Sequence, residues 1–282
     1  MSDDMSKDPV TRIRSSPSAI DYSALYNEHP EYVARRQVGS YEQAQIDIEV
    51  RRFKLPNLMR LVPAEQKFGD VLEIGCATGE LIAAVPVGEG GRKVGIDISS
   101  ANVESARMRF PQVEFRCGDF RTAALSDFFD AVIMSDVLEH VPDDREFLQD
   151  AATLGQIVLV NLPLEDNWLN RRRRYGPEDV SGHLRKYSLE DGLELFERAG
   201  LEVVAYSRVW VHETPTEQAR RALRYERFGA AFAGAWPMQV LRKAVFAAAS
   251  AMPWFGRRLL ASNLFVAARR KPLVVADQGR GS

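Results

Sequence analysis

Cysteine is scarce in this chain, and long apolar runs are absent. Only two cysteines occur among its 282 residues, Cys76 and Cys117, so no framework of several disulfides can form. No uninterrupted apolar stretch is long enough to span a bilayer, and residues 1–18 lack the apolar segment of a secretory signal. These absences predict a protein of the reducing cytoplasm.

An excess of charge of one sign is also missing. The chain has 37 Lys and Arg against 39 Asp and Glu, a formal net charge of −2. Nucleic-acid-binding proteins usually carry a strongly basic surface, so this balance argues against nucleic acid as a partner. The 45% of hydrophobic residues is enough to fill one large core with further elements around it.

The most informative segment joins an apolar strand, a glycine turn and a helix. Residues 71–84 read VLEIGCATGELIAA. Such a turn brings backbone N–H groups close to a ligand at the C-terminal edge of a parallel sheet. A second apolar strand, 94–98, contains Asp97, which follows Gly75 by 22 positions (97 − 75). This is close to the interval of about 20 residues at which an acid reaches a ribose hydroxyl. A nucleotide-type ligand is therefore predicted.

The turn itself differs from the two common nucleotide-binding patterns. It reads Glu73-x-Gly75-x-Ala77-x-Gly79, so it is not the G-x-x-x-x-G-K-[ST] phosphate loop. The last glycine of the G-x-G-x-x-G dinucleotide pattern is missing as well. An acid inside the strand, at Glu73, would repel a pyrophosphate and attract a cationic ligand.

The turn resembles motif I of the class I S-adenosylmethionine (SAM) methyltransferases, E/D-x-G-x-G-x-G, with Ala77 in place of the middle glycine. The resemblance continues through Asp97, through residues 117–120 (CGDF) and through the strand and loop at 129–141. It implies that Asp97 binds the ribose and that Asp119 faces the adenine amine. The cofactor-binding residues that it implies are Glu73, Gly75, Ala77, Gly79, Asp97, Ile98, Asp119, Phe120 and Ser135.

The implied fold is α/β: a doubly wound, Rossmann-like sheet of seven strands whose last strand is antiparallel and lies between strands 5 and 6. Strands and helices alternate from 71 to 164, which predicts parallel strands with right-handed crossovers. Tyrosines before the first strand either face the SAM sulfonium or belong to a solvated helical cap. The expected parts are a disordered tail (1–20), an N-terminal helical cap (21–62), a SAM-binding core (63–210), a helical insertion (211–261), a final strand (262–270) and a tail (271–282).

The insertion is locally basic and amphipathic. Residues 211–270 contain 10 Lys and Arg against 3 Asp and Glu, a local charge of +7 (10 − 3). Thr214-Pro215-Thr216-Glu217 is a capping box that predicts a helix start, and 237–252 is a second predicted helix flanked by Trp236, Trp254 and Phe255. Two readings stay open: residues 214–258 contact anionic lipid at the inner membrane surface, or they form a lid or a homodimer contact.

Candidate catalytic side chains follow strands 4 and 5: Asp136, His140 and His183. Methyl transfer is an in-line displacement that depends on holding the nucleophile near the methyl carbon, and a hydroxyl nucleophile benefits from a base. The Asn/Asp-Pro-Pro-Tyr/Phe pattern of amine methyltransferases is absent after strand 4. Its absence favours an oxygen acceptor.

A group of acids and histidines after strand 4 resembles the E-x-x-E-H…H metal ligands of small-RNA 2′-O-methyltransferases. These residues are Asp136, Glu139 and His140, followed later by His183. The E-x-x-E-H part also occurs in ubiquinone-pathway O-methyltransferases. If the three residues at 136–140 share one helical side, they could bind Mg²⁺ or Mn²⁺. The alternative, which the sequence favours, is a Glu-His pair that positions the loop without a metal.

The stretch 182–188, GHLRKYS, resembles bacterial methyltransferases of polysaccharide and lipid pathways, and four arginines at 171–174 predict a basic rim. The expected reaction is methyl transfer from SAM to a hydroxyl of a small or lipid-linked, anionic glycan or lipid acceptor. Two alternatives stay open: a metal-assisted quinone-type or RNA 2′-O-methyltransferase, and a SAM-binding regulatory subunit without turnover.

Overall fold

A computed structural model describes residues 22–271, apart from 64, 124, 126, 168–169, 177–178, 180, 211–214, 229–243, 246, 249–250 and 253–261. Its centre is a seven-stranded sheet in the order β3-β2-β1-β4-β5-β7-β6. The strands are β1 (Val71–Ile74), β2 (Lys93–Asp97), β3 (Glu114–Cys117), β4 (Phe129–Ser135), β5 (Gly155–Leu164), β6 (Leu201–Trp210) and β7 (Ser262–Arg270).

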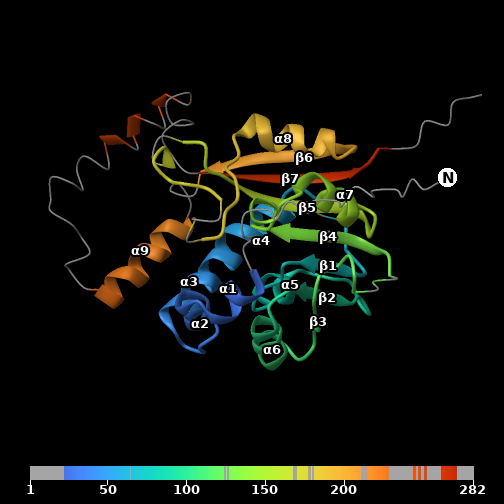
Figure 1. Cartoon of the computed structure of the whole chain (residues 1–282), viewed down its shortest axis with the longest axis horizontal. Helices are drawn as coiled ribbons and strands as arrows, with labels where there is room; N and C mark the ends of the chain where they lie inside the picture. Colours follow the sequence, from blue (N-terminus) through green and yellow to red (C-terminus); the bar gives the residue numbers. More distant parts are fainter. Residues whose placement is uncertain are drawn as a thin grey trace, which may run out of the picture.

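Strands β1 to β5 pair in parallel, whereas β7 pairs antiparallel with both β5 and β6. The expected fold, with an antiparallel last strand between strands 5 and 6, is confirmed. The parallel strands end on one side of the molecule, toward the cap helices at the left of Figure 1. Ligands of doubly wound sheets bind at this edge.

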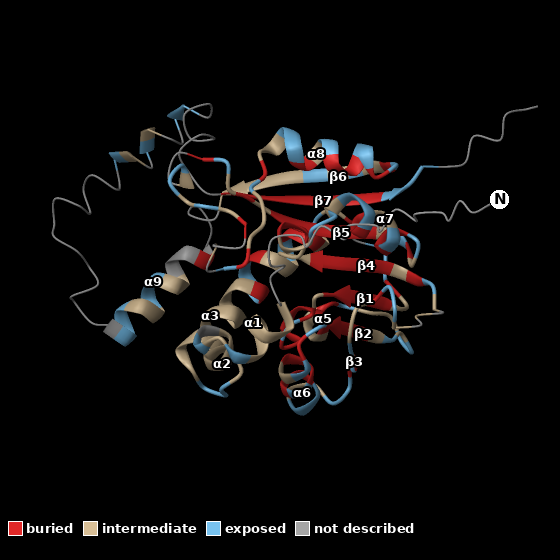
Figure 2. Ribbon diagram, in the orientation of Figure 1, coloured by how far each residue is buried: buried red, intermediate tan, exposed pale blue. Residues whose placement is uncertain are grey.

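Side chains of the central strands are buried on both faces of the sheet, as the red strands in Figure 2 show. On one face, Leu72 and Val132 pack with Leu148 of α7 and Phe196 of α8. On the other, Val71 and Ile133 pack with side chains of α4, α5 and α6. These covering helices are α4 (Leu55–Met59), α5 (Glu80–Ala84), α6 (Ser100–Arg109), α7 (Asp144–Ala152) and α8 (Leu189–Arg198).

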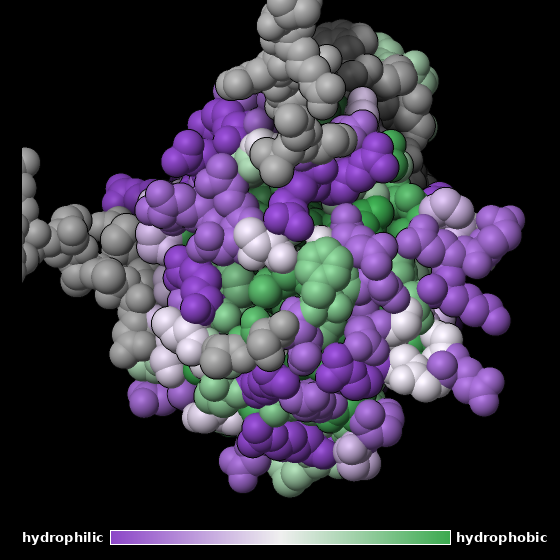
Figure 3. All heavy atoms as spheres, turned by 90° about the vertical axis from the view of Figure 1, so that its right-hand side faces the viewer, coloured by the Kyte–Doolittle hydropathy of each residue, from purple (hydrophilic) through white to green (hydrophobic). Residues whose placement is uncertain are grey.

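Helix α8 begins at a reciprocal capping box formed by Ser188 and Asp191, and Gly200 follows the helix with a φ of 73°. Figure 3 shows the opposite side from the cap. There, hydrophilic side chains surround a smaller central group of hydrophobic ones.

The cap contains α1 (Tyr22–Glu28), α2 (Pro30–Arg35) and α3 (Tyr41–Glu49). A π-helical turn, η1 (Val50–Lys54), joins α3 to α4. Phe53 in this turn is buried edge-on against Phe265 of β7, with ring centroids 5.3 Å apart. Asn27 accepts hydrogen bonds from the Ser99 hydroxyl and the Ala101 N–H, which ties α1 to the start of α6. The cap is therefore fastened at two places.

Helix α9 (Pro215–Phe228) is the part of the insertion that the structure describes best, and it begins at the predicted first helical residue, Pro215. The Thr214 of the predicted capping box lies outside the described residues. It packs against α3. The expected second helix and the residues Trp236, Trp254 and Phe255 fall wholly or largely outside the described residues, as do both expected tails. Among the described helices, none is long and apolar enough to cross a bilayer.

Candidate active site

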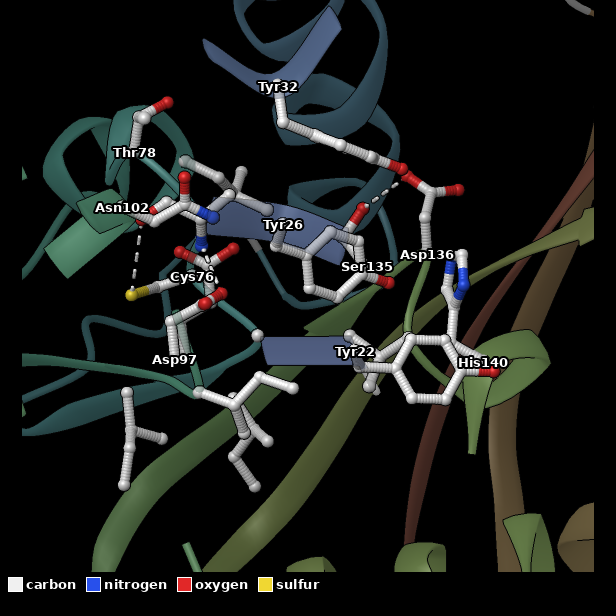
Figure 4. A pocket seen from close by; sticks show the side chains of 18 of the residues that line it. Tyr22, Tyr26, Tyr32, Cys76, Thr78, Asp97, Asn102, Ser135, Asp136 and His140 are labelled. Carbon is white, nitrogen blue, oxygen red and sulfur yellow. Dashed lines mark hydrogen bonds between the residues drawn. The ribbon is translucent and has the colours of Figure 1, made fainter. Parts of the chain in front are cut away.

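A cavity of about 630 Å³ lies at the carboxyl ends of β1, β2 and β4, beneath the cap (Figure 4). This volume is in the range of small-molecule sites. All the predicted site residues line it except Gly79 and Glu139. Figure 4 shows Asp97 at one end and Asp136 and His140 at the other, with cap tyrosines between them.

The glycine turn after β1 needs left-handed backbone at three positions. The φ angles are 75° at Gly75, 45° at Ala77 and 85° at Gly79. A Cβ at Gly75 would lie 2.6 Å from Val137, and one at Gly79 would lie 2.7 Å from the Phe115 ring. Gly79 therefore serves close packing below the turn, while Gly75 keeps the turn close to the cavity.

Asp97 connects the glycine turn after β1 to the turn after β2. Its carboxylate accepts the Ala77 N–H at 2.9 Å and the Ser99 N–H at 2.8 Å. Burial raises the pKa of this carboxyl above its ordinary value. The Asn102 side chain also bonds to this carboxylate. A carboxylate has about four acceptor positions, so about one remains for a ribose hydroxyl.

Glu73 is buried inside β1 and accepts the Ile82 N–H at 2.8 Å. Burial raises the pKa of its carboxyl to about 8. A cation bound in the cavity would favour the ionised form and lower that pKa.

Asp119 and Phe120 line the cavity after β3. The Asp119 carboxylate is engaged by Arg121 at 2.6 Å, and this bond lowers its pKa. Contact between Asp119 and an adenine amine therefore stays a prediction. Phe120 is buried edge-on against Phe147, with centroids 4.9 Å apart.

Three cap tyrosines form an aromatic wall over the cavity. The rings of Tyr22 and Tyr26 are stacked at 5.9 Å, and Tyr32 meets Tyr26 edge-on at 4.9 Å. The Tyr22 hydroxyl also donates to the Gly182 carbonyl at 2.9 Å. All three rings line the cavity, and aromatic faces attract a cation such as a sulfonium. Contact between these tyrosines and SAM stays a prediction.

Asp136 is held in strained backbone at the end of β4, with a φ of 56°. Its N–H donates to the Asn161 carbonyl at 3.0 Å. Its carboxylate accepts the Asn161 side-chain amide at 3.1 Å and pairs with Lys54 at 2.6 Å. Nothing in the residue pattern distinguishes Lys54 from the two nearby arginines, Arg51 and Arg52. Only the π-helical turn brings Lys54 to Asp136.

Glu139, His140 and His183 come together beside Asp136, with one ligand atom of each within 4.8 Å of the others. The His140 Nδ1–H donates to the Gly182 carbonyl at 3.1 Å, and the His183 Nδ1–H donates to Glu165 at 2.7 Å. In the neutral rings, both Nε2 atoms therefore carry a free lone pair. Burial, helped by His183, lowers the pKa of His140 to about 4, which keeps this ring neutral.

The buried Glu139 carboxyl has no hydrogen-bond partner for either oxygen among the described residues. Burial and the nearby Asp136 raise its pKa well above the ordinary value. Asp136, the fourth residue of the metal-binding alternative, lies outside this three-residue group. That residue precedes the short 3₁₀ turn η2 (Leu138–His140) in left-handed backbone and pairs with Lys54, so it does not share one helical side with Glu139 and His140.

The predicted basic rim is only partly directed inward. Arg173 pairs with Asp179 and Glu165, whereas its neighbours Arg171, Arg172 and Arg174 are exposed. Glu165 follows β5 and supports both Arg173 and His183. Glu165 is not among the residues predicted for the site, although an acid directly after the end of a strand was a signal for it.

A family model described as a methyltransferase domain matches residues 46–206, more than half of the chain. The chain belongs to the class I SAM-dependent methyltransferases. Over 145 residues it is 32% identical to a probable S-adenosylmethionine-dependent methyltransferase of Mycolicibacterium smegmatis, covering 48% of this chain and 52% of the relative. It is 25% identical to a ubiquinone biosynthesis O-methyltransferase of a Bradyrhizobium species, covering 50% of this chain and 64% of the relative.

The chain thus spans between about half and two-thirds of the length of these curated relatives. Among solved structures, it shares the fold of a Haemonchus contortus phosphoethanolamine N-methyltransferase bound to phosphomonomethylethanolamine and S-adenosylhomocysteine. The TM-score is 0.60 at 16% identity, covering 91% of this chain and 62% of that one. A possible histamine N-methyltransferase of Thermotoga maritima gives 0.52 at 19%, covering 85% and 99%.

In this methyltransferase the cavity has two ends with different chemistry. We expect SAM to bind at the end formed by the glycine turn, Glu73 and Asp97, named here the cofactor end. We expect the methyl acceptor at the end formed by Asp136, His140 and His183, named the acceptor end.

The first prediction concerns the close approach at Gly75. In Gly75→Ala, we expect the SAM dissociation constant to rise at least about tenfold, because the Cβ is both strained and in contact with Val137. Gly90→Ala is the matched control, since Gly90 has a φ of 77° with no atom within 4 Å of a Cβ. Calorimetry should show unchanged SAM affinity in the control. Equal losses in both variants would contradict the assignment.

The second prediction concerns Glu73. Because its pKa is about 8, the carboxyl is mostly protonated below that pH, and binding of cationic SAM releases the proton. SAM affinity should therefore increase with pH, by at most about tenfold per pH unit, between about pH 6 and about pH 8. In Glu73→Gln this slope should disappear in the same titration. A slope that persists in the variant would assign the proton to another group.

Proposed function

We propose that this protein transfers the methyl group of SAM to a hydroxyl of a small or lipid-linked glycan or lipid acceptor. The observation that carries the proposal is the histidine pair at the acceptor end, in which His140 and His183 both present a free Nε2. A hydroxyl must lose a proton as it attacks, and a neutral imidazole is a suitable base.

His183 is the better base of the two. Its Nδ1–H is held by Glu165, and a carboxylate there stabilises the imidazolium that forms when Nε2 takes a proton. His140, with its low pKa, stays neutral and orients the acceptor hydroxyl. In the reaction, the acceptor oxygen forms a bond to the methyl carbon and the carbon–sulfur bond breaks with its electrons going to sulfur. The hydroxyl proton moves to His183.

Asp136 has a different role in this proposal. Its carboxylate is already paired with Lys54 and hydrogen-bonded to Asn161, so it orders the loop after β4 and leaves proton transfer to the histidines. The Bradyrhizobium relative, which is named as a ubiquinone biosynthesis O-methyltransferase, supports an oxygen acceptor. The phosphoethanolamine N-methyltransferase does not, and its similarity extends only to the fold.

A lipid-linked acceptor would be reached from the membrane surface. Helix α9 carries the exposed side chains of Arg221 and Arg227, and the sequence from 214 to 258 is basic and apolar in alternation. Such an element binds anionic lipid through charge and shallow burial. We therefore also propose that the protein is cytoplasmic and that residues 214–258 contact the inner membrane surface peripherally.

A second candidate is a metal-assisted form of the same reaction. It is favoured by Glu139, whose buried carboxyl lacks any hydrogen-bond partner among the described residues and lies beside two free imidazole nitrogens. These three residues fit a divalent cation, and both rings have the hydrogen-bonded Nδ1 typical of metal ligands. Imidazole ligands suit Mn²⁺ better than Mg²⁺. A bound metal would lower the pKa of the acceptor hydroxyl.

The proposed function predicts where a labelled methyl group goes. Purified protein is incubated with methyl-labelled SAM and an extract of the source cells, and the lipid, soluble, RNA and protein fractions are counted. We expect label in the lipid or glycolipid fraction, reduced about 100-fold or more in His183→Ala with SAM affinity unchanged. Label in RNA or protein would contradict the acceptor class. SAM binding without any labelled product would indicate a regulatory subunit.

The metal candidate makes a separate prediction that does not depend on turnover. Mn²⁺ binding, followed by electron paramagnetic resonance, should weaken about 10-fold to 100-fold in Glu139→Gln. Asp136→Asn is the control, because Asp136 lies outside the three-residue group. If the wild-type protein does not bind Mn²⁺, or if both variants bind it equally, the metal-assisted form is wrong.

A further inference from the structure

Four charged side chains of alternating sign connect the insertion to the acceptor end. Arg220 of α9 pairs with Glu49 at the end of α3. Glu49 lies 3.3 Å from Lys54, and Lys54 lies 2.6 Å from Asp136. All four line the cavity and are partly buried, with exposed side-chain fractions between 18% and 29%.

Lys54 stands between two carboxylates that compete for it. Its ammonium is closer to Asp136 than to Glu49. Glu49 is in turn satisfied by Arg220, and the pKa of Glu49 is lowered by Lys54 and Arg220 although burial alone would raise it. Screening by water is weak in such a partly buried site, so an unpaired carboxylate would attract the nearest cation strongly.

Removal of Arg220 would therefore change the partner of Lys54. Glu49 would keep its negative charge and lose its ion pair with Arg220. The flexible four-carbon side chain of Lys54 allows its ammonium to move toward Glu49. Asp136 would then lose the ion pair that, together with Asn161, holds its strained backbone.

The other end of the insertion approaches Asp136 as well. Asn263, the second residue of β7, donates to the side-chain oxygen of Asn161 at 2.8 Å. The amide of Asn161 then donates to Asp136 and to the Ser135 hydroxyl. Helix α9 of the insertion and strand β7, which follows the insertion, are thus both connected to Asp136 through hydrogen bonds or ion pairs.

We propose that Arg220 is a positioning residue for methyl transfer, which acts through Glu49 to keep Lys54 on Asp136. Through Arg220, the insertion then helps to hold the geometry of the acceptor end, in addition to its proposed contact with the membrane surface. This inference rests on the proposed function for its kinetic consequence, but its structural consequence does not depend on the acceptor.

The test is a double-mutant cycle between Arg220 and Glu49. In Arg220→Met, we expect kcat to fall about 100-fold while SAM affinity stays within about threefold of the wild type. Glu49→Gln alone should have little effect, because the neutral amide does not compete for Lys54. The double variant Glu49→Gln/Arg220→Met should recover kcat to within about threefold of the wild type. If Arg220 acted through packing alone, the double variant would keep the full loss of kcat seen in Arg220→Met, and the proposal would be wrong.

Two controls accompany the cycle. Arg220→Lys keeps a cation opposite Glu49 and should retain most of kcat. Arg198→Met removes an exposed arginine of α8 that does not line the cavity, and it should leave both kcat and SAM affinity unchanged. A loss in Arg198→Met equal to that in Arg220→Met would overturn the proposal.

Crystal structures of the variants with S-adenosylhomocysteine test the same inference without an acceptor. The Lys54 ammonium should contact Glu49 in Arg220→Met and return to Asp136 in the double variant. If Lys54 stays on Asp136 in Arg220→Met, the proposal is wrong whichever acceptor the enzyme uses. If the ammonium moves as expected but no acceptor is methylated, the positioning of Asp136 stands and the proposed function fails.

Discussion

The ion pair between Lys54 and Asp136 is the contact on which the arrangement of the acceptor end depends. It joins the π-helical turn of the cap to the end of β4, two segments that are far apart in the sequence. Left-handed backbone at a non-glycine residue costs about 1–3 kcal/mol, and the surrounding contacts must offset this cost. Because Asp136 is fixed, the turn that follows can direct Glu139 inward and His140 into the cavity.

The cavity combines two kinds of electrostatic environment. At the cofactor end, buried acids accept backbone N–H groups, and burial raises the pKa of both Glu73 and Asp97. A cationic cofactor offsets that cost when it binds. At the acceptor end, Arg220, Glu49, Lys54 and Asp136 pair with one another, and the low pKa of His140 keeps that ring neutral, so a neutral hydroxyl can enter without breaking an ion pair.

The sequence predicted the fold and most of the residues that line the cofactor end of the cavity, because both depend on local patterns. The apolar strand, the glycine turn and the acid at Asp97 follow one another at short spacing, and the antiparallel last strand followed from the family resemblance. The acceptor end was predicted less well. Lys54 and Arg220 act through pairings across long sequence separations, and the left-handed backbone of Asp136 has no signal in the residue type.

We propose that Lys54 organises the acceptor end and takes no part in cofactor binding. The most direct test measures SAM affinity and methyl transfer in parallel for Lys54→Met and the wild type. We expect the SAM dissociation constant to stay within about threefold, while the transfer rate falls about 100-fold because Asp136 is no longer held. Unchanged transfer, or a matching loss of SAM affinity, would contradict the division of the cavity into two ends.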